Sequence, residues 1–580
     1  MNRLLLAKGI LSLTAVTLIT SCIDDKYDLT DIDTTTEINV KDLTIPVKLD
    51  TLTLKNVIDL DDDDLIKTDS VNNIYSIEKG GNIDNTAFDL GQINVENLDI
   101  SPTNIPIYIK QSVNTSILPS DDGIQLDDID FGNPEMRPYD YTMSNVNDAL
   151  KVLRKITTKS PISITVNLSL PPEFLGTGNQ FSFKDIKVQL PSDLIMEEGY
   201  KYDSDSGILE IQSLPITDGK ATLNLQASGM QLSTAKGTVI NGKIELKGNV
   251  GILGGKISMK VKNINISAGT YNIKSEYEVS GFSVKDFTGD IDYKMNDIQI
   301  DPISLNDLPD FLNNSQTNII IENPIIKVNL KNPVGKYGID GKGTLNFISK
   351  FSNGSKTHSG EFSISGENSK LAFCTDKANE VDLIREGYTP IKIEGLNYIL
   401  SNGYVGLPQE ISVSVTNLEF MGNNITLPVG TLGYASGSYN FYAPLAFGAG
   451  TEIYYNTTES GWWSEDIEKV NIYNLEISAK CTSKLPVNIS LRVQPIDRNG
   501  KIIEIEETND FIVPANCTNV PVSIAIKGKN GSAIKDFDGA IFEAKVTQTE
   551  ENAPAIGPNI KIELTDLRFT VSGNFLYEDK

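Results

Sequence analysis

The residues of this chain that could carry out acid–base or nucleophilic chemistry are few, apart from its carboxylates. The 580 residues include 77 Asp and Glu, 4 Cys and a single histidine, His358. A Ser-His-Asp or Cys-His site would have to use this histidine, which lies in the turn-like stretch 353–360 between two glycines. Metal sites built from several imidazoles are excluded. We therefore expect a protein that is not an enzyme and has neither catalytic residues nor a cofactor.

The weak calcium candidate of the chain is the pair Asp203 and Asp205, because carboxylate oxygens are the ligands that calcium prefers. The two residues belong to an Asp-x-Asp-x-Gly pattern, but Leu214 stands where an EF-hand loop would need its last Glu. The pattern also directly precedes an expected strand, so a hairpin turn is the favoured interpretation. We accordingly predict no metal site.

Aromatic residues concentrate between Tyr434 and Trp463, and this stretch is our candidate ligand-binding site. Trp462 and Trp463 are adjacent, so on a strand they would face opposite ways and one ring would be exposed. Exposed aromatic rings offer a large contact area at low entropic cost. Packing in the core or between domains is the commoner role of such residues. If the chain binds a ligand, we expect these tryptophans to do so together with Tyr454 and Tyr455.

The cysteines do not form a disulfide framework. Cys22 follows Arg3, Lys8 and an apolar run at 9–19, which is too short for a permanent membrane span and typical of a signal peptide. The other three, Cys374, Cys481 and Cys517, are too few to staple a chain of this length. A bridge between Cys481 and Cys517 is one interpretation, and buried free thiols are the favoured one.

The end of this signal peptide, Ile19-Thr20-Ser21-Cys22, resembles a bacterial lipobox. The resemblance implies that residues 1–21 are removed and that Cys22 becomes the acylated N-terminus. The acidic tether at 22–35 is similar to the export tag of Bacteroides-type lipoproteins, which implies anchoring on the outer face of the outer membrane. An ordinary solvated linker on a periplasm-facing protein is the alternative. A diacyl-type anchor supplies the two hydrophobic chains that stable attachment requires.

The charge of the chain limits its partners. Its net charge of −27 repels phosphate backbones, so we predict no nucleic-acid partner. The expected partners are the membrane, through the lipid anchor, and a glycan or an envelope protein.

Hydrophobic alternation with a period of two predicts an all-β protein. Apolar residues occupy every second position in the segments 162–170, 487–493 and 522–526, as half-buried strands require. Asn-Gly pairs at 241–242, 499–500 and 530–531 favour tight hairpins. We expect tandem antiparallel β-sandwich domains.

A short motif recurs along the chain and predicts β-bulges. Its pattern is apolar, any residue, Asn or Asp, Leu or Ile, any residue, apolar. The copies contain Asp42, Asn97, Asp128, Asp185, Asn263, Asp297, Asn417, Asn474 and Asp566. In each copy the apolar residues before and after the Asn or Asp are an odd number of positions apart, so a regular strand would turn them to opposite faces. One extra, unpaired residue at the Asn or Asp would keep both sets on the same face. Asn and Asp tolerate the backbone conformation that this needs.

A few short helices and a tandem repeat complete the prediction. Helical spacing favours helices at 144–155, 304–313 and 464–469. Similar strand starts at Pro161, Pro324 and Pro486 recur at near-equal intervals, which suggests repeated units. The predicted division places a signal peptide at 1–21, a tether at 22–35, and four β domains at 36–143, 144–303, 304–465 and 466–580.

The C-terminal segments 441–448, 485–489 and 495–500 resemble those of large Bacteroides-type outer-membrane lipoproteins that have no assigned reaction. The resemblance implies a location and an all-β build, and it transfers no catalytic residue. Our first hypothesis is a surface protein with a non-catalytic binding or scaffolding role. The alternative is a lipid-binding or envelope-bridging protein whose curved amphipathic sheet includes residues 237–284. A polysaccharide hydrolase is the least favoured of the three.

Overall fold

The computed structural model describes most of the chain between Thr36 and Tyr577. The described residues are 36–46, 52–53, 66–69, 72–95, 98–115, 122–305, 314–401, 403, 406–461, 470–506 and 510–577. Four sequence-based expectations lie outside these ranges: lipidation at Cys22, the Trp462–Trp463 pair, the helix at 464–469 and most of the helix at 304–313. Among the described helices, none has the length and apolar character needed to cross a membrane.

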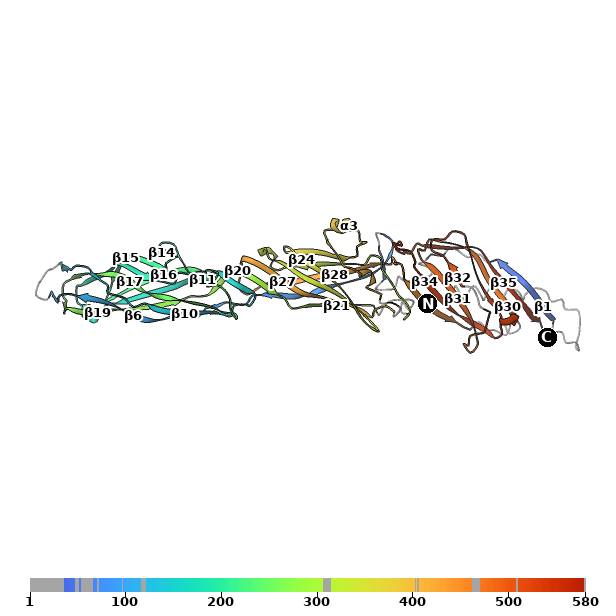
Figure 1. The fold of residues 1–580 in the computed structure, drawn as a ribbon, viewed down its shortest axis with the longest axis horizontal. Helices are drawn as coiled ribbons and strands as arrows, with labels where there is room; N and C mark the ends of the chain where they lie inside the picture. Colours follow the sequence, from blue (N-terminus) through green and yellow to red (C-terminus); the bar gives the residue numbers. More distant parts are fainter. Residues whose placement is uncertain are drawn as a thin grey trace.

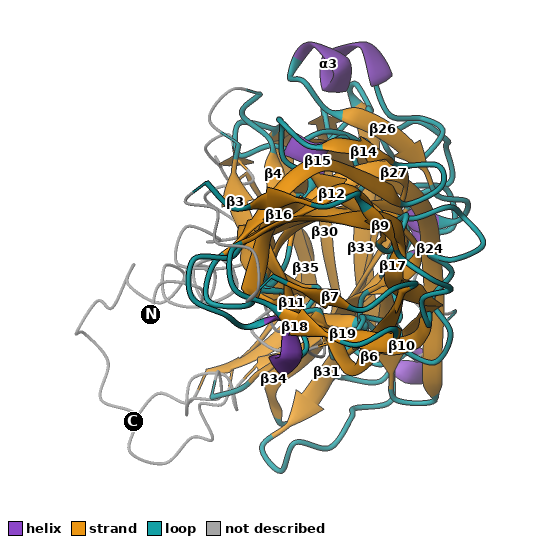
Figure 2. Ribbon diagram, turned by 90° about the vertical axis from the view of Figure 1, so that its left-hand side faces the viewer, coloured by secondary structure: helices purple, strands orange, loops and turns teal. Residues whose placement is uncertain are grey.

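The molecule is an elongated stack of three β-sandwiches (Figure 1), which we call the base, middle and distal sandwiches. Their sheets are antiparallel, except where β25 pairs with β26 in parallel. The predicted all-β fold of antiparallel sandwiches is confirmed. Figure 2, a view along the stack, shows strands enclosing its long axis and the helix α3 (Glu380–Arg385) projecting from one side.

The base sandwich contains the first and the last strands of the described chain. One sheet is formed by β1 (Thr36–Pro46), β2 (Leu52–Thr53), β35 (Lys561–Tyr577), β30 (Val470–Ser483) and β33 (Val520–Lys527). The facing sheet is formed by β29 (Glu452–Glu459), β34 (Phe537–Thr547), β31 (Asn488–Asp497) and β32 (Phe511–Val513). Apolar residues of both sheets pack between them, including Val493 and Ile524.

The middle sandwich pairs a six-stranded sheet with half of a ten-stranded sheet. The six strands are β26 (Thr389–Lys392), β25 (Asn368–Cys374), β22 (Ile325–Lys331), β28 (Thr431–Pro444), β4 (Tyr75–Asp89) and β3 (Ile66–Thr68). The facing strands are β20 (Val284–Lys294), β27 (Glu410–Pro428), β23 (Asp340–Phe351), β24 (Gly354–Ile364) and β21 (Ile298–Ser304). Aromatic contacts join the two layers, such as Phe88 stacked on Tyr293 with ring centroids 4.0 Å apart.

The distal sandwich uses the other half of the ten-stranded sheet. This half is formed by β11 (Leu150–Ser169), β16 (Lys220–Gln231), β13 (Leu194–Met196), β19 (Gly269–Ser280) and β6 (Leu98–Ile109). The facing sheet contains β14 (Lys201–Asp203), β15 (Ile208–Ile216), β12 (Gln180–Gln189), β17 (Ile244–Val261), β10 (Arg137–Ser144), β5 (Asn94–Val95), β8 (Ile124–Gln125) and β9 (Ile129–Asp130). A two-stranded ribbon of β7 (Val113–Asn114) and β18 (Asn265–Ile266) lies at the outer end.

The chain runs out along the stack and back, so the sheets do not follow the consecutive domains suggested by the sequence. It passes from β1 in the base through β4 in the middle to the distal sandwich, and returns through β20 and β28 to β35. As a result β1 pairs with β35, and Thr36 is opposite Tyr577. The expected boundaries at 143, 303 and 465 cut through these pairings, because strands that are distant in sequence complete the same sheets.

The predicted bulges are confirmed at four copies of the motif. At Asn474, a further copy inside a paired strand, the register shifts just before the motif residue, whose φ is not positive. Asp42, Asp185, Asn417 and Asp566 have φ values of 53°, 50°, 53° and 52°, in the left-handed region. Each lies at a shift in strand register. Asn and Asp tolerate this conformation better than other residues with a Cβ. The motif therefore marks positions where a strand gains one residue and keeps its apolar face toward the core.

The helix expected at 144–155 is wrong, since this segment is a turn followed by the start of β11. Leu150, Leu153 and Ile156 are buried at a spacing of three, which is also typical of a helix. Here the spacing arises because β11 shifts register against β20 between Leu150 and Val152 and again between Leu153 and Lys155. Two closely spaced bulges thus imitate helical periodicity. The helix α3 was not expected, and it is capped by the side chain of Asn379.

The proline repeat is only partly a set of strand starts. Pro324 and Pro486 lie just before β22 and β31, as expected. Pro161 lies inside β11, where the pairing with β20 ends at Thr158 and the pairing with β19 begins at Ser163. Its missing N–H falls in the gap between two ladders, so no sheet hydrogen bond is lost.

We predict that the bulge at Asn417 depends on the left-handed backbone and not on the side chain, which is exposed. Asn417→Gly should change the free energy of unfolding by only a few tenths of a kcal/mol, whereas Asn417→Ala should lower it by about 1 kcal/mol. Denaturant unfolding of the purified chain measures both. The exposed Asn249 of β17, which lacks a positive φ, provides the control, and Asn249→Ala should have little effect. Equal losses for the Gly and Ala variants of Asn417 would contradict the interpretation.

Candidate functional site

The predicted aromatic site falls on β29, an edge strand of the base sandwich. Tyr454 is half-buried: its hydroxyl donates to Glu452 Oε2 at 2.9 Å, and its ring centroid lies 5.1 Å from Lys545 Nζ. Tyr455 faces the opposite way and is 41% exposed. The structure thus gives Tyr454 a packing role and leaves Tyr455 on the surface. Because Trp462 and Trp463 lie outside the described residues, ligand binding at this edge stays a prediction.

The calcium candidate forms the hairpin turn between β14 and β15. The Asp203 carboxylate accepts hydrogen bonds from the Ser206 hydroxyl at 2.6 Å and from the Asp205 backbone N–H at 3.0 Å. The Ser206 bond, followed by the bond from Asp205, lowers the pKa of Asp203. Gly207 closes the turn with a φ of 72°. The carboxylate is therefore used by the turn, and the described ranges contain no group of three or more His, Cys, Asp or Glu side chains placed to hold a metal.

His358 does not lie in a loop as expected, but on β24 opposite Phe347 of β23. The polar stretch is a two-faced strand, in which Ser355, Thr357 and Ser359 point outward and His358 is only 5% exposed. The imidazole bonds to the backbone of Glu394, and within the described structure its Nε2 has no hydrogen-bond partner. Burial, followed by the positive charge of Lys356, lowers the pKa of His358. Among the described residues, this imidazole makes no hydrogen bond to the side chain of a serine, threonine or cysteine.

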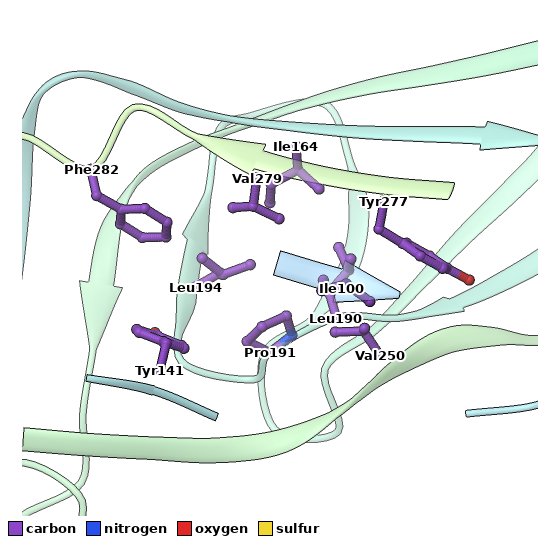
Figure 3. A pocket seen from close by; sticks show the side chains of 10 residues that line it. All are labelled: Ile100, Tyr141, Ile164, Leu190, Pro191, Leu194, Val250, Tyr277, Val279 and Phe282. Atoms are coloured by element: carbon purple, nitrogen blue, oxygen red, sulfur yellow. The ribbon is translucent and has the colours of Figure 1, made fainter. Parts of the chain in front are cut away.

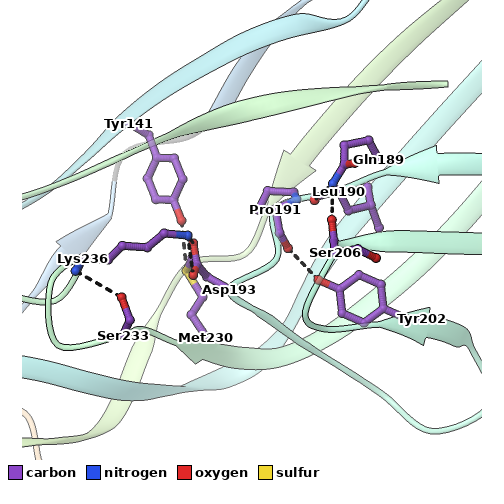
Figure 4. A network of polar contacts seen from close by, with 10 residues as sticks. All are labelled: Tyr141, Gln189, Leu190, Pro191, Asp193, Tyr202, Ser206, Met230, Ser233 and Lys236. Carbon is purple, nitrogen blue, oxygen red and sulfur yellow. Dashed lines mark hydrogen bonds and ion pairs between the residues drawn. The ribbon is translucent and has the colours of Figure 1, made fainter. Parts of the chain in front are cut away.

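A partly buried ion pair lies near tyrosines in the distal sandwich (Figure 4). Lys236 Nζ lies 2.9 Å from both carboxylate oxygens of Asp193, whose side chain is 9% exposed. Burial, followed by the negative charge of Asp193, raises the pKa of Tyr139 to about 12 and raises the pKa of Tyr202. Both phenols therefore stay protonated at neutral pH and do not act as bases.

The same group of residues closes one edge of the distal sandwich. The Tyr202 hydroxyl donates to the Pro191 carbonyl at 2.7 Å, and the Tyr141 hydroxyl donates to Met230 Sδ at 3.1 Å. The Asp193 carbonyl accepts the backbone N–H of Gln231 at 2.7 Å. The Asp193 bond therefore fastens the connection between β12 and β13 to β16, and the Tyr202 bond fastens the same connection to β14. The Tyr141 bond joins β10 to β16.

An apolar cavity lies beside this connection, between the two sheets of the distal sandwich (Figure 3). Its walls include Ile100 and Ile164 from one sheet, Val250 from the other, and Phe282. The volume of about 10 Å³ is close to the minimum that holds one water, and the side chains around it offer few polar partners. The cavity is a packing defect of the core and not a ligand site.

The Asp193–Lys236 pair was not found from the sequence. Asp193 follows Pro191 and Ser192 in what looks like an ordinary turn, and Lys236 comes 43 residues later. No spacing rule links two such residues, because the pairing of β13, which follows Asp193, with β16, which precedes Lys236, brings them together. The described candidate residues Tyr454, Tyr455, Asp203 and Asp205 do not converge either, since they lie in the base and the distal sandwich.

No protein-family model and no curated protein matches this chain. Among solved structures, a protein described as secreted, from Parabacteroides distasonis ATCC 8503, has a TM-score of 0.36 at 15% identity, covering 50% of this chain and 89% of that chain. The structure of infectious bursal disease virus Gx strain has a TM-score of 0.12 at 10% identity, covering 89% of this chain and 82% of that chain. None of these TM-scores defines a shared fold.

We predict that removing Lys236 lowers the free energy of unfolding more than removing the charge of its partner Asp193. Lys236→Met leaves the buried Asp193 carboxylate without its cation and should cost about 2–3 kcal/mol, less than a fully buried pair because Lys236 is 42% exposed. Asp193→Asn frees a lysine that can reach water and should cost about 1 kcal/mol. The double variant should be more stable than the sum of the two losses implies. Denaturant unfolding, with hydrogen exchange of the β16 amides, measures all three, and a larger loss for Asp193→Asn would contradict the assignment.

The single histidine predicts a defined pH dependence of stability. Its pKa in the folded chain is below the ordinary value of 6.5, so the unfolded chain takes up the proton first as the pH falls. The free energy of unfolding should therefore decrease below about pH 6.5, by at most about 1.4 kcal/mol per pH unit. His358→Gln should remove this slope between about pH 6.5 and 5, above the range where carboxylates titrate. An unchanged slope in thermal unfolding would show that other groups cause it.

Proposed function

We propose that this protein is a non-catalytic rod, anchored in the outer membrane through Cys22, that presents its distal sandwich to a glycan, a host polymer or an envelope partner. The observation that carries the proposal is the pairing of β1 with β35. It puts Thr36, which follows the 22–35 tether, at the outer end of the base sandwich. A tether of this length spans at most about 50 Å when fully extended. The base would then face the membrane and the distal sandwich would point away from it.

Contacts between the base and the middle sandwich support a stiff rod. The backbones of Asn318 and Glu452 exchange hydrogen bonds of 2.7 and 2.8 Å. Glu322, which is 5% exposed, pairs with Lys377 at 2.7 Å and accepts the backbone N–H of Asn552 at 3.3 Å. Because these polar groups are buried, a hinge motion at this junction would leave them unpaired. The ten-stranded sheet joins the middle and the distal sandwich in a similar way.

The outer end of the distal sandwich is the surface that such a rod would present. It is formed by the loops at 109–115, 170–180, 217–220 and 261–269 (Figure 1). Most of its exposed side chains are polar, among them Lys110, Ser112, Asn114, Thr177, Asp218, Lys262, Asn263 and Ser267. Loops at the end of a rigid sandwich commonly carry recognition. The polar surface suits a hydrated partner better than an apolar one.

The alternative of a lipid-binding sheet has less support. The segment 237–284 contributes to a sandwich that is filled by side chains. Two cavities in the described body have volumes of about 10 and 40 Å³. Each holds at most a few waters, so neither accommodates an acyl chain.

An epitope tag at either end of the rod tests the proposal. Asp218-Gly219 at the outer end and Asn530-Gly531 at the base are matched turns, since all four residues have positive φ. On intact cells, an antibody should reach a tag inserted at Asp218-Gly219 much better than one at Asn530-Gly531, which lies close to the membrane. Cys22→Ala should release both tagged chains from the envelope fraction.

Two results would overturn the proposal. Equal or better access to the base tag would show that the rod does not point outward. Access to both tags only after the outer membrane is permeabilised would show that the chain faces the periplasm.

A further inference from the structure

Two buried cysteines of the base sandwich lie against each other. Cys481 on β30 is 0% exposed and Cys517, between β32 and β33, is 6% exposed. Both belong to one apolar cluster with Val513 and Phe569. The Cys517 thiol donates to the Cys481 carbonyl at 3.6 Å, and it also lies within hydrogen-bond reach of the Cys481 thiol. The structure records both cysteines as free thiols.

The backbone around Cys517 is fixed on both sides of this contact. Its carbonyl accepts the backbone N–H of Ser483 at 2.9 Å. The N–H of Asn516 donates to the Leu485 carbonyl at 2.8 Å, and the N–H of Asn519 donates to the Thr482 hydroxyl at 3.0 Å. Chain neighbours of Cys517 are thus bonded to chain neighbours of Cys481. The two sulfur atoms are held together by the fold and do not meet by chance rotation of one side chain.

We propose that Cys481 and Cys517 form a disulfide when the chain folds outside the cytoplasm, and that the bond clamps β30 to the connection between β32 and β33. The proposal rests on the export inferred above, because disulfides persist in oxidising compartments. In the reaction each thiol loses one proton and one electron and one S–S bond forms. The two electrons reduce the disulfide of an exported thiol–disulfide exchange partner to a dithiol.

The timing follows from burial. Loss of solvent raises the pKa of Cys481 to about 12 in the folded chain, so its thiolate is scarce there. Exchange needs a thiolate and access, and the bond therefore forms before the base sandwich closes. The bond would link residues 36 positions apart within the sandwich that carries the anchor. Cys374 is buried in a separate cluster with Ala372 and Leu383, and it serves as the internal control.

Thiol counting on the whole mature chain, with Cys22→Ala to avoid acylation, tests the inference. After folding in a mixture of reduced and oxidised glutathione, the chain is denatured without reductant and alkylated. We expect one labelled cysteine per chain, Cys374, and three when reductant is added. Trypsin digestion should give peptides 481–484 and 502–527 linked by a disulfide. Cys374→Ser should give no label, and Cys481→Ser should give two labels.

Failure of this inference and failure of the proposed function give different results. Three labelled thiols without reductant, on a chain folded under oxidising conditions, would overturn the disulfide whatever the location. A bond that forms in glutathione but is absent from chains isolated from cells would support the closeness of the two cysteines and would contradict the proposed export. In the oxidised chain we also expect an unfolding midpoint several degrees higher than in the reduced chain, and no increase would remove its role as a clamp.

Discussion

A strand that buries one face must keep its apolar side chains on that face over its whole length. This constraint applies to the long strands throughout the molecule. Many strands are long enough to pair with several others. Along such a strand the alternation has to shift by one residue at some positions, so that the apolar side chains return to the buried face. Asp42, Asp185, Asn417 and Asp566 do so with a single left-handed residue each. They lie in all three sandwiches. The same local device thus keeps the apolar faces of long strands toward the core in each sandwich.

The out-and-back course of the chain follows from the same pairing. Strands that are hundreds of residues apart complete one sheet, as β1 and β35 do. The two ends of the described chain therefore meet at the base, while the middle of the sequence forms the distal end. A polypeptide made of independent consecutive domains would instead put its two ends at opposite ends of a stack. The proposed anchor at Cys22 would orient this arrangement relative to the membrane.

Most of the buried titratable and nucleophilic side chains described above make contacts within the fold. The buried imidazole of His358 packs against a strand, and the Asp193 carboxylate is neutralised by Lys236 at a sandwich edge. Glu322 joins two sandwiches, and the thiols of Cys481 and Cys517 meet in the base. Each of these groups lies where two structural elements meet.

The sequence alone predicted the fold class, the bulges at Asp42, Asp185, Asn417 and Asp566, and the hairpin turn at Asp203, because alternation and the backbone preferences of Asn and Asp are local properties. It failed at 144–155, where two bulges imitate a helix, and at His358, where a polar strand resembles a loop. The order of the strands, the Asp193–Lys236 pair and the contact of the two cysteines were decided only by the tertiary structure. They depend on which distant strands pair, and strands of similar pattern are compatible with many partners until the whole core is packed.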